Sequence, residues 1–124
     1  MSMLDDLYET IGGSDTIEAA IVSFYRRVLE DENLRPFFHS ADMAHVRAGQ
    51  SMFISMLLGG RVVYTGKDIN AAHANARAEG LTGEHLDAFF KHFRAAIEEV
   101  GVEPDKAEKV MKLLEAQRAA VLNH

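Results

Sequence analysis

The stretch GLTGEHLDAFFKHFRAAIEEVG, residues 80–101, decides the fold class of this chain. Thr82 stands where a helix N-cap is expected, and Gly101 is a typical helix stop. Between them the apolar side chains recur every three or four residues, which is the spacing of one helix face. They are Leu86, Phe89, Phe90, Phe93, Ile97 and Val100. The stretch therefore predicts a long amphipathic helix with one face in the core.

The same spacing predicts helices on both sides of this one. Asp15 and Glu18 have capping-box spacing near the start of a second helix, and Asp42 is placed to cap a third. Pro104 suits the first turn of a last helix, whose apolar stripe includes Val121. The expected helices, besides the one above, cover about residues 3–11, 14–29, 43–57, 69–76 and 104–121, with a corner at 36–39 and a loop at 61–66. The fold class is therefore all-α.

Composition and charge describe one ordinary globular unit. The chain has 124 residues, 48% of them hydrophobic and 26% charged, so residues 1–124 are expected to form a single domain. The net charge of −6 argues against nucleic acid and anionic membranes as partners, because both favour a basic face. Cysteine is absent, which excludes disulfides and thiolate ligands and is consistent with the cytoplasm. The acidic N-terminus does not resemble a signal peptide.

Two polar side chains share helix faces with apolar ones. Gln50 lies on the same helix face as Val46 and Phe53. Burying an amide without a hydrogen bond lowers the stability of a fold by about 2 kcal/mol or more. Gln50 either bonds a neighbouring backbone group, lies at the edge of the stripe, or points into a ligand pocket. Tyr25 follows Phe24 on the inner side of its helix, where a tyrosine commonly keeps its hydroxyl in water.

His73 is one of six histidines and lies on the alanine-rich segment INAAHANA, residues 69–76. Small neighbours leave room for a large flat group, although a lone histidine is more often structural or exposed than a metal ligand. The other five form neither HExxH nor a zinc set, and His85 and His92 are interpreted as surface residues. Motifs for phosphate binding, dinucleotide binding or a nucleophile elbow are also missing.

Eight short segments in a fixed order resemble the group 1 truncated haemoglobins, over roughly residues 4–121. They are LYETIGG (7–13), FYRRVL (24–29), LRPFF (34–38), DMAHVRAGQ (42–50), LGG (58–60), YTG (64–66), AAH (71–73) and GLTGEHLD (80–87). Within this resemblance the two glycine pairs, Gly12–Gly13 and Gly59–Gly60, correspond to motifs of the family that permit a shortened, two-over-two globin sandwich. The resemblance thus makes the expected fold class a truncated globin-like two-over-two helical sandwich.

The resemblance also assigns roles to individual residues. It implies haem b, iron protoporphyrin IX, as cofactor, with His73 as the proximal ligand of the haem iron. It implies Tyr25 and Gln50 as the distal residues that stabilise a bound ligand and act in any catalysis. The haem pocket that it implies is lined by Phe38, Val46, Phe53, Ile54, Tyr64 and Thr65.

The function implied by the resemblance is binding of dioxygen and other diatomic ligands such as nitric oxide. Slow release of dioxygen would suit detoxification of nitric oxide to nitrate, with an electron-donating reductase as partner. The alternatives are an oxygen carrier or store, a gas sensor without turnover, and a cofactor-free helical interaction module. The protein is expected to be a monomer or weak dimer.

Near the distal site that the resemblance implies, the sequence departs at two positions from some members of the family that it resembles. Gly49 replaces a longer residue, histidine in some relatives, that can ligate the iron, so no six-coordinate state from that position is expected. Ile54 is smaller than the aromatic residue of some relatives, which weakens any gate on a ligand tunnel. His45 is expected to point outward, toward solvent or a haem propionate.

Overall fold

The computed structural model describes residues 3–60 and 72–123, and these residues form helices and no strand. The all-α prediction is confirmed. None of the described helices is long and apolar enough to cross a membrane. The elements are α1 (Met3–Thr10), α2 (Gly13–Glu30), the 3-10 helix η1 (Arg35–Phe38), α3 (Met43–Leu57), α5 (Ala74–Ala78), α6 (Gly83–Glu99), α7 (Pro104–Glu115) and α8 (Arg118–Leu122).

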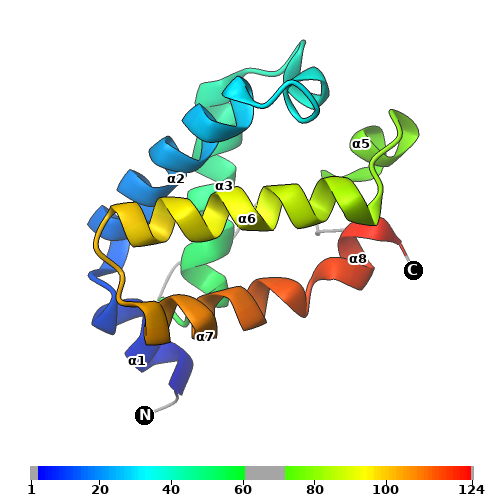
Figure 1. The fold of residues 1–124 in the computed structure, drawn as a ribbon. Helices are drawn as coiled ribbons and strands as arrows, with labels where there is room; N and C mark the ends of the chain where they lie inside the picture. The colour runs from blue at the N-terminus through cyan, green and yellow to red at the C-terminus, as the bar shows by residue number, and fades with distance from the viewer. Residues whose placement is uncertain (1–2, 61–71, 124) are drawn as a thin grey trace.

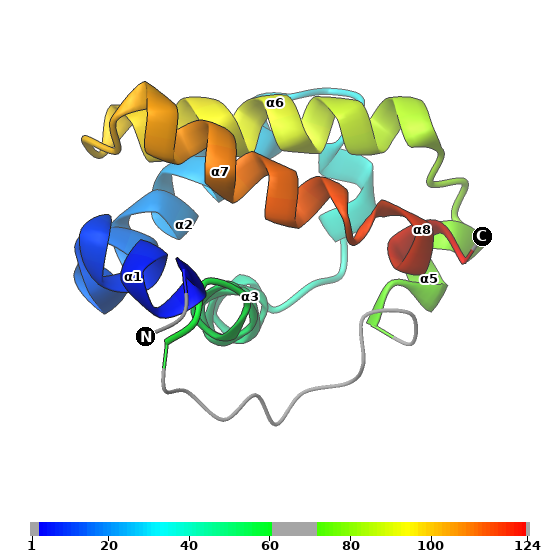
Figure 2. The ribbon, with the colours of Figure 1, turned by 90° about the horizontal axis from the view of Figure 1, so that it is seen from below.

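The four long helices form two crossed pairs. Figure 1 shows α6 and α7 running side by side across the direction of α2 and α3, and Figure 2 shows α3 on the other side of the molecule from α6. The central helix α2 packs against both α3 and α6, and α6 packs against α7. This arrangement is the expected two-over-two sandwich.

The apolar stripe of α2 is the centre of the core. Its buried side chains pack with those of α6, and the Phe24 and Phe93 rings meet edge to face at 5.4 Å between centroids. At the outer edge of the same interface the Glu99 carboxylate of α6 accepts hydrogen bonds from the Ser23 hydroxyl, from Arg26 (3.0 Å) and from Arg27 (2.8 Å) of α2. Apolar contact and ion pairs therefore fix the same helix crossing.

The two glycine pairs meet at one tyrosine. An added Cβ at Gly60 would lie 2.8 Å from the Tyr8 ring and 2.9 Å from the Ser55 carbonyl oxygen, and one at Gly13 would lie 3.8 Å from the Tyr8 ring. The Tyr8 N–H donates to the Leu58 carbonyl across 3.2 Å. The pairs thus allow the end of α1 to approach the end of α3 closely.

Three predicted helix starts are confirmed. The Asp42 carboxylate accepts from the Ala44 and His45 N–H groups at 3.1 and 3.3 Å, and Pro104 occupies the first turn of α7. Thr82 is the N-cap of α6, and its N–H donates to His85 Nδ1 at 3.1 Å. Each of these starts is determined by residues within one helical turn.

Two sequence-based expectations are wrong. The Asp15–Glu18 capping box does not form, because α2 already begins at Gly13 and its N-cap is Gly12 in a left-handed conformation with φ 114°. The last helix is interrupted: α7 ends at Glu115 and Val121 belongs to the separate helix α8. At this break Arg118 contacts α6, a tertiary contact that local sequence does not reveal. Of the expected helix at 69–76, residues 69–71 lie outside the described residues, and α5 covers Ala74–Ala78.

Candidate functional site

Among the predicted polar site residues that the structure describes, Tyr25 is the most deeply buried. It lies on α2 with 4% of its surface exposed, and burial raises the pKa of its phenol well above the ordinary value. Within the described residues no group is hydrogen-bonded to its hydroxyl. Every completely enclosed side-chain nitrogen or oxygen of those residues has a hydrogen-bond partner. Since the Tyr25 hydroxyl has none, it is not completely enclosed and keeps some access to its surroundings. Tyr25 is thus a protonated donor in a mainly apolar setting.

Aromatic side chains hold the Tyr25 ring in place. The Phe38 ring, at the end of η1, meets it edge to face at 5.6 Å between centroids. Phe38 also lies 6.1 Å from Phe89 of α6, and it is itself half-buried. The structure therefore brings together two predicted site residues, Tyr25 and Phe38, and adds Phe89. The helical stripe predicted Phe89 as a core residue, and nothing in the sequence singled it out for the site.

One face of α3 carries other described residues that were predicted for the site. Val46, Gln50 and Phe53 are half-buried, whereas Ile54 is 4% exposed and belongs to the core. The Gln50 amide has no hydrogen-bond partner within the described residues. Of the three positions that the sequence allowed for this amide, the one with a hydrogen bond to a neighbouring backbone group is therefore not seen. The apolar stripe of α2, by contrast, is almost entirely buried. This face of α3 is therefore less completely packed than the core face of α2.

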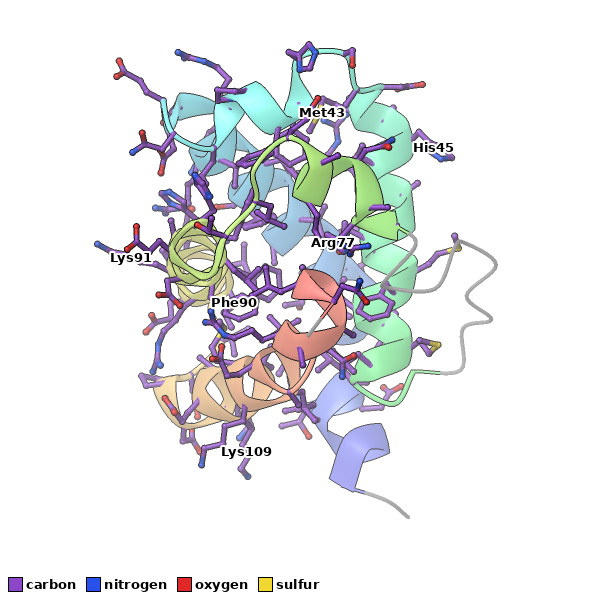
Figure 3. The ribbon with its side chains drawn as sticks, turned by 90° about the vertical axis from the view of Figure 1, so that its right-hand side faces the viewer. Met43, His45, Arg77, Phe90, Lys91 and Lys109 are labelled. Atoms are coloured by element: carbon purple, nitrogen blue, oxygen red, sulfur yellow. The ribbon has the colours of Figure 1, made fainter. Side chains whose placement is uncertain are left out.

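His73 lies on a different element from Tyr25 and Gln50. It is the N-cap of α5 and is half-buried, and its carbonyl accepts from the Arg77 N–H at 3.0 Å. Figure 2 shows α3 and α5 on the same side of α6. His45, on α3, is exposed and points away from the helices in Figure 3, as expected. Tyr64 and Thr65 lie outside the described residues.

Other histidines have structural partners. His92 Nε2 lies 2.8 Å from Asp31 Oδ2, and hydrogen bonding by His92 lowers the pKa of the Asp31 carboxyl. The His85 ring lies 5.1 Å from the Phe37 ring and closes the cap of α6. Both side chains are half-buried, so the interpretation as plain surface residues was too simple.

Two cavities border the described helices. A surface groove of about 410 Å³ is lined by Asn33, Pro36, Phe37, His39, Glu79 and His85, which include none of the predicted site residues. A core cavity of about 10 Å³ adjoins Ile54 and Phe93. Among residues 3–60 and 72–123, no group of three His, Asp or Glu side chains is arranged to hold a metal ion. A metal centre built from several such side chains is thus not seen in this part of the chain.

Two crossed helix pairs, with a buried tyrosine on the central helix and a histidine at the start of a separate short helix, are the arrangement of a globin type of protein. The bacterial-like globin family model matches residues 6–123. This chain belongs to the bacterial-like globin family.

Relatives of this chain include several group 1 truncated haemoglobins. The chain is 34% identical to the one from Tetrahymena pyriformis over 98% of both chains, and 37% identical to one from Synechocystis over 86% of this chain and 87% of the relative. The solved Fe(III) structure of the Tetrahymena protein matches with a TM-score of 0.87 at 35% identity, covering 94% of this chain and 97% of that one. A 2/2 haemoglobin from Synechococcus, described with covalently attached haem, matches at 0.89 and 32% identity, over 95% and 98% of the two chains. The resemblance noted from the sequence is confirmed.

Proposed function

We propose that this chain binds haem b through His73 and uses Tyr25 and Gln50 to hold a diatomic ligand on the opposite side. Membership of a globin family supports haem-based gas binding in general. The observation that carries the specific proposal is Tyr25, a buried phenol whose hydroxyl has no partner among the described residues. Because this hydroxyl keeps some access to its surroundings, it can donate a hydrogen bond to a group bound beside it.

The described residues fit a haem. The α3 face with Val46 and Phe53 is apolar and half-buried, and Phe38 offers the edge of an aromatic ring beside it. These are the surroundings that a flat apolar macrocycle requires. His73 is half-buried between alanines, Ala72 and Ala74, whose small side chains do not obstruct a large group. The imidazole is a common axial ligand of haem iron.

The distal residues differ in what each can do for a ligand. Haem, when bound, supplies an iron atom at which a diatomic gas binds. Tyr25 is protonated at neutral pH, as a phenol ordinarily is, and burial raises its pKa further, so it can donate one hydrogen bond. Gln50 can donate amide hydrogens or accept from Tyr25, whereas Val46 can do neither. A hydrogen bond to a ligand carrying partial negative charge contributes about 1.5–3 kcal/mol, which slows release by about tenfold to a hundredfold.

Slow release favours nitric oxide dioxygenation over oxygen delivery. Nitric oxide and dioxygen combine to nitrate, and this withdraws one electron from the protein in each cycle. An external reductase must return that electron. An oxygen carrier, an oxygen store or a gas sensor uses the same distal residues without turnover. We further propose that residues 1–124 act as a single cytoplasmic domain, as a monomer or weak dimer.

The haem proposal is tested by the colour of the purified protein. The wild type should bind haemin and show a Soret band, and His73→Ala should hold haem weakly or through a wrong ligand. His45→Ala is the matched control, because His45 is exposed and points away from the helices. A colourless protein that does not take up haemin would leave the cofactor-free interaction module as the better hypothesis.

The reaction is tested by adding nitric oxide to the oxygenated protein. Dioxygenation predicts rapid loss of the oxygenated spectrum and one nitrate per protein molecule. Persistence of that spectrum would favour the carrier or sensor. With a reductase present, repeated cycles should follow.

A further inference from the structure

His73 is the N-cap of the short helix α5, which is too short to be stable by itself. This helix has five residues, Ala74–Ala78, whereas isolated helices below about 12–15 residues are marginal in water. The Arg77 N–H donates to the His73 carbonyl at 3.0 Å, so Arg77 lies one helical turn after the histidine. Any contact that holds Arg77 therefore also holds the turn that bears His73.

The Arg77 side chain is held by the C-terminal helix. Its Nη1 donates to the Val121 carbonyl of α8 at 2.9 Å, across 44 residues of sequence. Val121 is itself 5% exposed and thus fixed in position. A cation is favourable at this place, because the last carbonyls of a helix lack helical partners and carry partial negative charge. Figure 3 shows Arg77 projecting from α5 toward α8, and Figures 1 and 2 show both helices at the same end of the molecule.

A second arginine fixes α8 to the core layer. Arg118 donates to the Gly83 carbonyl at 3.3 Å and to the Asp87 carboxylate at 2.5 Å, both on α6. Its guanidinium carbon lies 5.3 Å from the centre of the Phe90 ring, also on α6. A continuous set of contacts thus runs from α6 through α8 and Arg77 to the turn of His73.

We propose that Arg77 is a positioning residue that sets the orientation of the His73 side chain toward its axial ligand position. This inference rests on the proposed function, because it assumes that His73 ligates the haem iron. Arg77 acts through the backbone turn and does not itself touch the iron. Without its bond to Val121, α5 would lose a tertiary anchor, and the imidazole would sample a wider range of orientations.

The test compares three variants of the full-length haem protein. Arg77→Met keeps the length of the side chain and removes the donors, and Arg77→Lys keeps a charge but loses the planar fork of the guanidinium. Arg94→Met is the matched control, because Arg94 is an α6 arginine whose ion pairs join Glu98 and Glu108 at the surface. The readouts are the iron–histidine stretching band in the resonance Raman spectrum of the ferrous protein, and the rate of haem transfer to an excess of a haem-scavenging apoprotein.

Arg77→Met should shift or split the iron–histidine band and accelerate haem loss by about tenfold, as expected for one charge-assisted hydrogen bond. Arg77→Lys should lie between this variant and the wild type, and Arg94→Met should match the wild type. An unchanged band and unchanged haem loss in Arg77→Met would overturn the inference. Should that variant fail to fold, as judged by circular dichroism, an unchanged band and rate in Arg77→Lys would overturn it equally. A wild-type protein without any iron–histidine band would instead contradict the proposed function.

Discussion

At the scale of single residues, the Tyr25 hydroxyl is the group whose removal separates ligand binding from folding. Tyr25→Phe keeps the ring contact with Phe38 and removes a hydroxyl that has no partner among the described residues. We expect the free energy of unfolding to change by less than about 1 kcal/mol. We expect dioxygen to dissociate about tenfold to a hundredfold faster, because one donor to the ligand is lost. Stopped-flow release measurements and thermal unfolding test the two expectations separately.

Tyr8→Phe is the matched control for this substitution. Tyr8 lies between the two glycine pairs, and its backbone bonds to the end of α3. Its substitution should leave dioxygen dissociation as in the wild type. Equal dissociation rates for Tyr25→Phe and the wild type would remove Tyr25 from the distal site.

The sequence identified some of the candidate site residues more clearly than others. Helical spacing alone favoured structural readings of Gln50 and Tyr25 over the functional ones, and it left His73 as one histidine of six. Only the order of several short segments distinguished them. Arg77 carried no signal at all, because its partner is a backbone carbonyl 44 residues away. Contacts to backbone groups are independent of the partner's side chain, so no residue pattern reveals them.

At the scale of the elements, Gly60 and Gly49 form a matched pair of glycines around α3. A Cβ at Gly60 would come within 3.0 Å of both the Tyr8 ring and the Ser55 carbonyl, whereas one at Gly49 would have nothing within 4 Å. Gly60→Ala should therefore destabilise the fold by about 1–3 kcal/mol, since the backbone carbonyl cannot move aside cheaply. Gly49→Ala lies inside α3 and should stabilise it by up to about 1 kcal/mol through helix propensity.

Urea unfolding of these two alanine variants gives the comparison. Equal stability of Gly60→Ala and the wild type would show that α1 does not need its close approach to the end of α3. The same change in both variants would mean that propensity alone, and not space, governs the two positions.

The Glu99 ion-pair network predicts how acid loosens the contact between α2 and α6. The Ser23 hydroxyl, Arg27 and Arg26 lower the pKa of the Glu99 carboxyl from 4.5 to about 2. The pKa is lower in the folded state, so this stabilisation is fully present above pH 4.5 and is lost as the pH falls towards 2. Glu99→Gln should thus be less stable than the wild type at pH 7, and the difference should shrink below pH 4.

Urea titrations of both proteins at pH 7, 4 and 3 measure that difference. Glu98→Gln is the control on the same helix, because Glu98 makes a single ion pair with Arg94 at 3.6 Å. If the wild type were more stable than Glu99→Gln by the same free energy at pH 7 and at pH 3, the lowered pKa of the Glu99 carboxyl would be contradicted.

Helix boundaries were predictable where the signal lies within one turn. Thr82, Asp42 and Pro104 stand at helix starts for reasons of local hydrogen bonding and backbone geometry. The interruption between α7 and α8 has no glycine or proline to mark it. Arg118 instead bonds to α6 there, and tertiary contacts of this kind override local helix propensity.

At the scale of the whole molecule, the core and the proposed haem site are parts of one structure. The α2 helix supplies both the centre of the core, through Phe24, and the distal donor Tyr25 on the adjacent position. The half-buried face of α3 packs against this same helix. A group bound between the distal residues and His73 would therefore add contacts to the layer that already holds the fold together.

This shared layer predicts that haem raises the stability of the entire chain in one step. A ligand present at a thousand times its dissociation constant stabilises a protein by about 4 kcal/mol, which raises the Tm of a domain of this size by about 10 °C or more. Thermal unfolding followed by helix signal and by Soret absorbance should give coincident single transitions for the haem-bound protein. His73→Ala should lose most of the increase, while its haem-free form should melt like the haem-free wild type. His45→Ala should keep the full increase. Two separate helix transitions would contradict a single domain, and equal Tm values with and without haemin would contradict a haem site in the core layer.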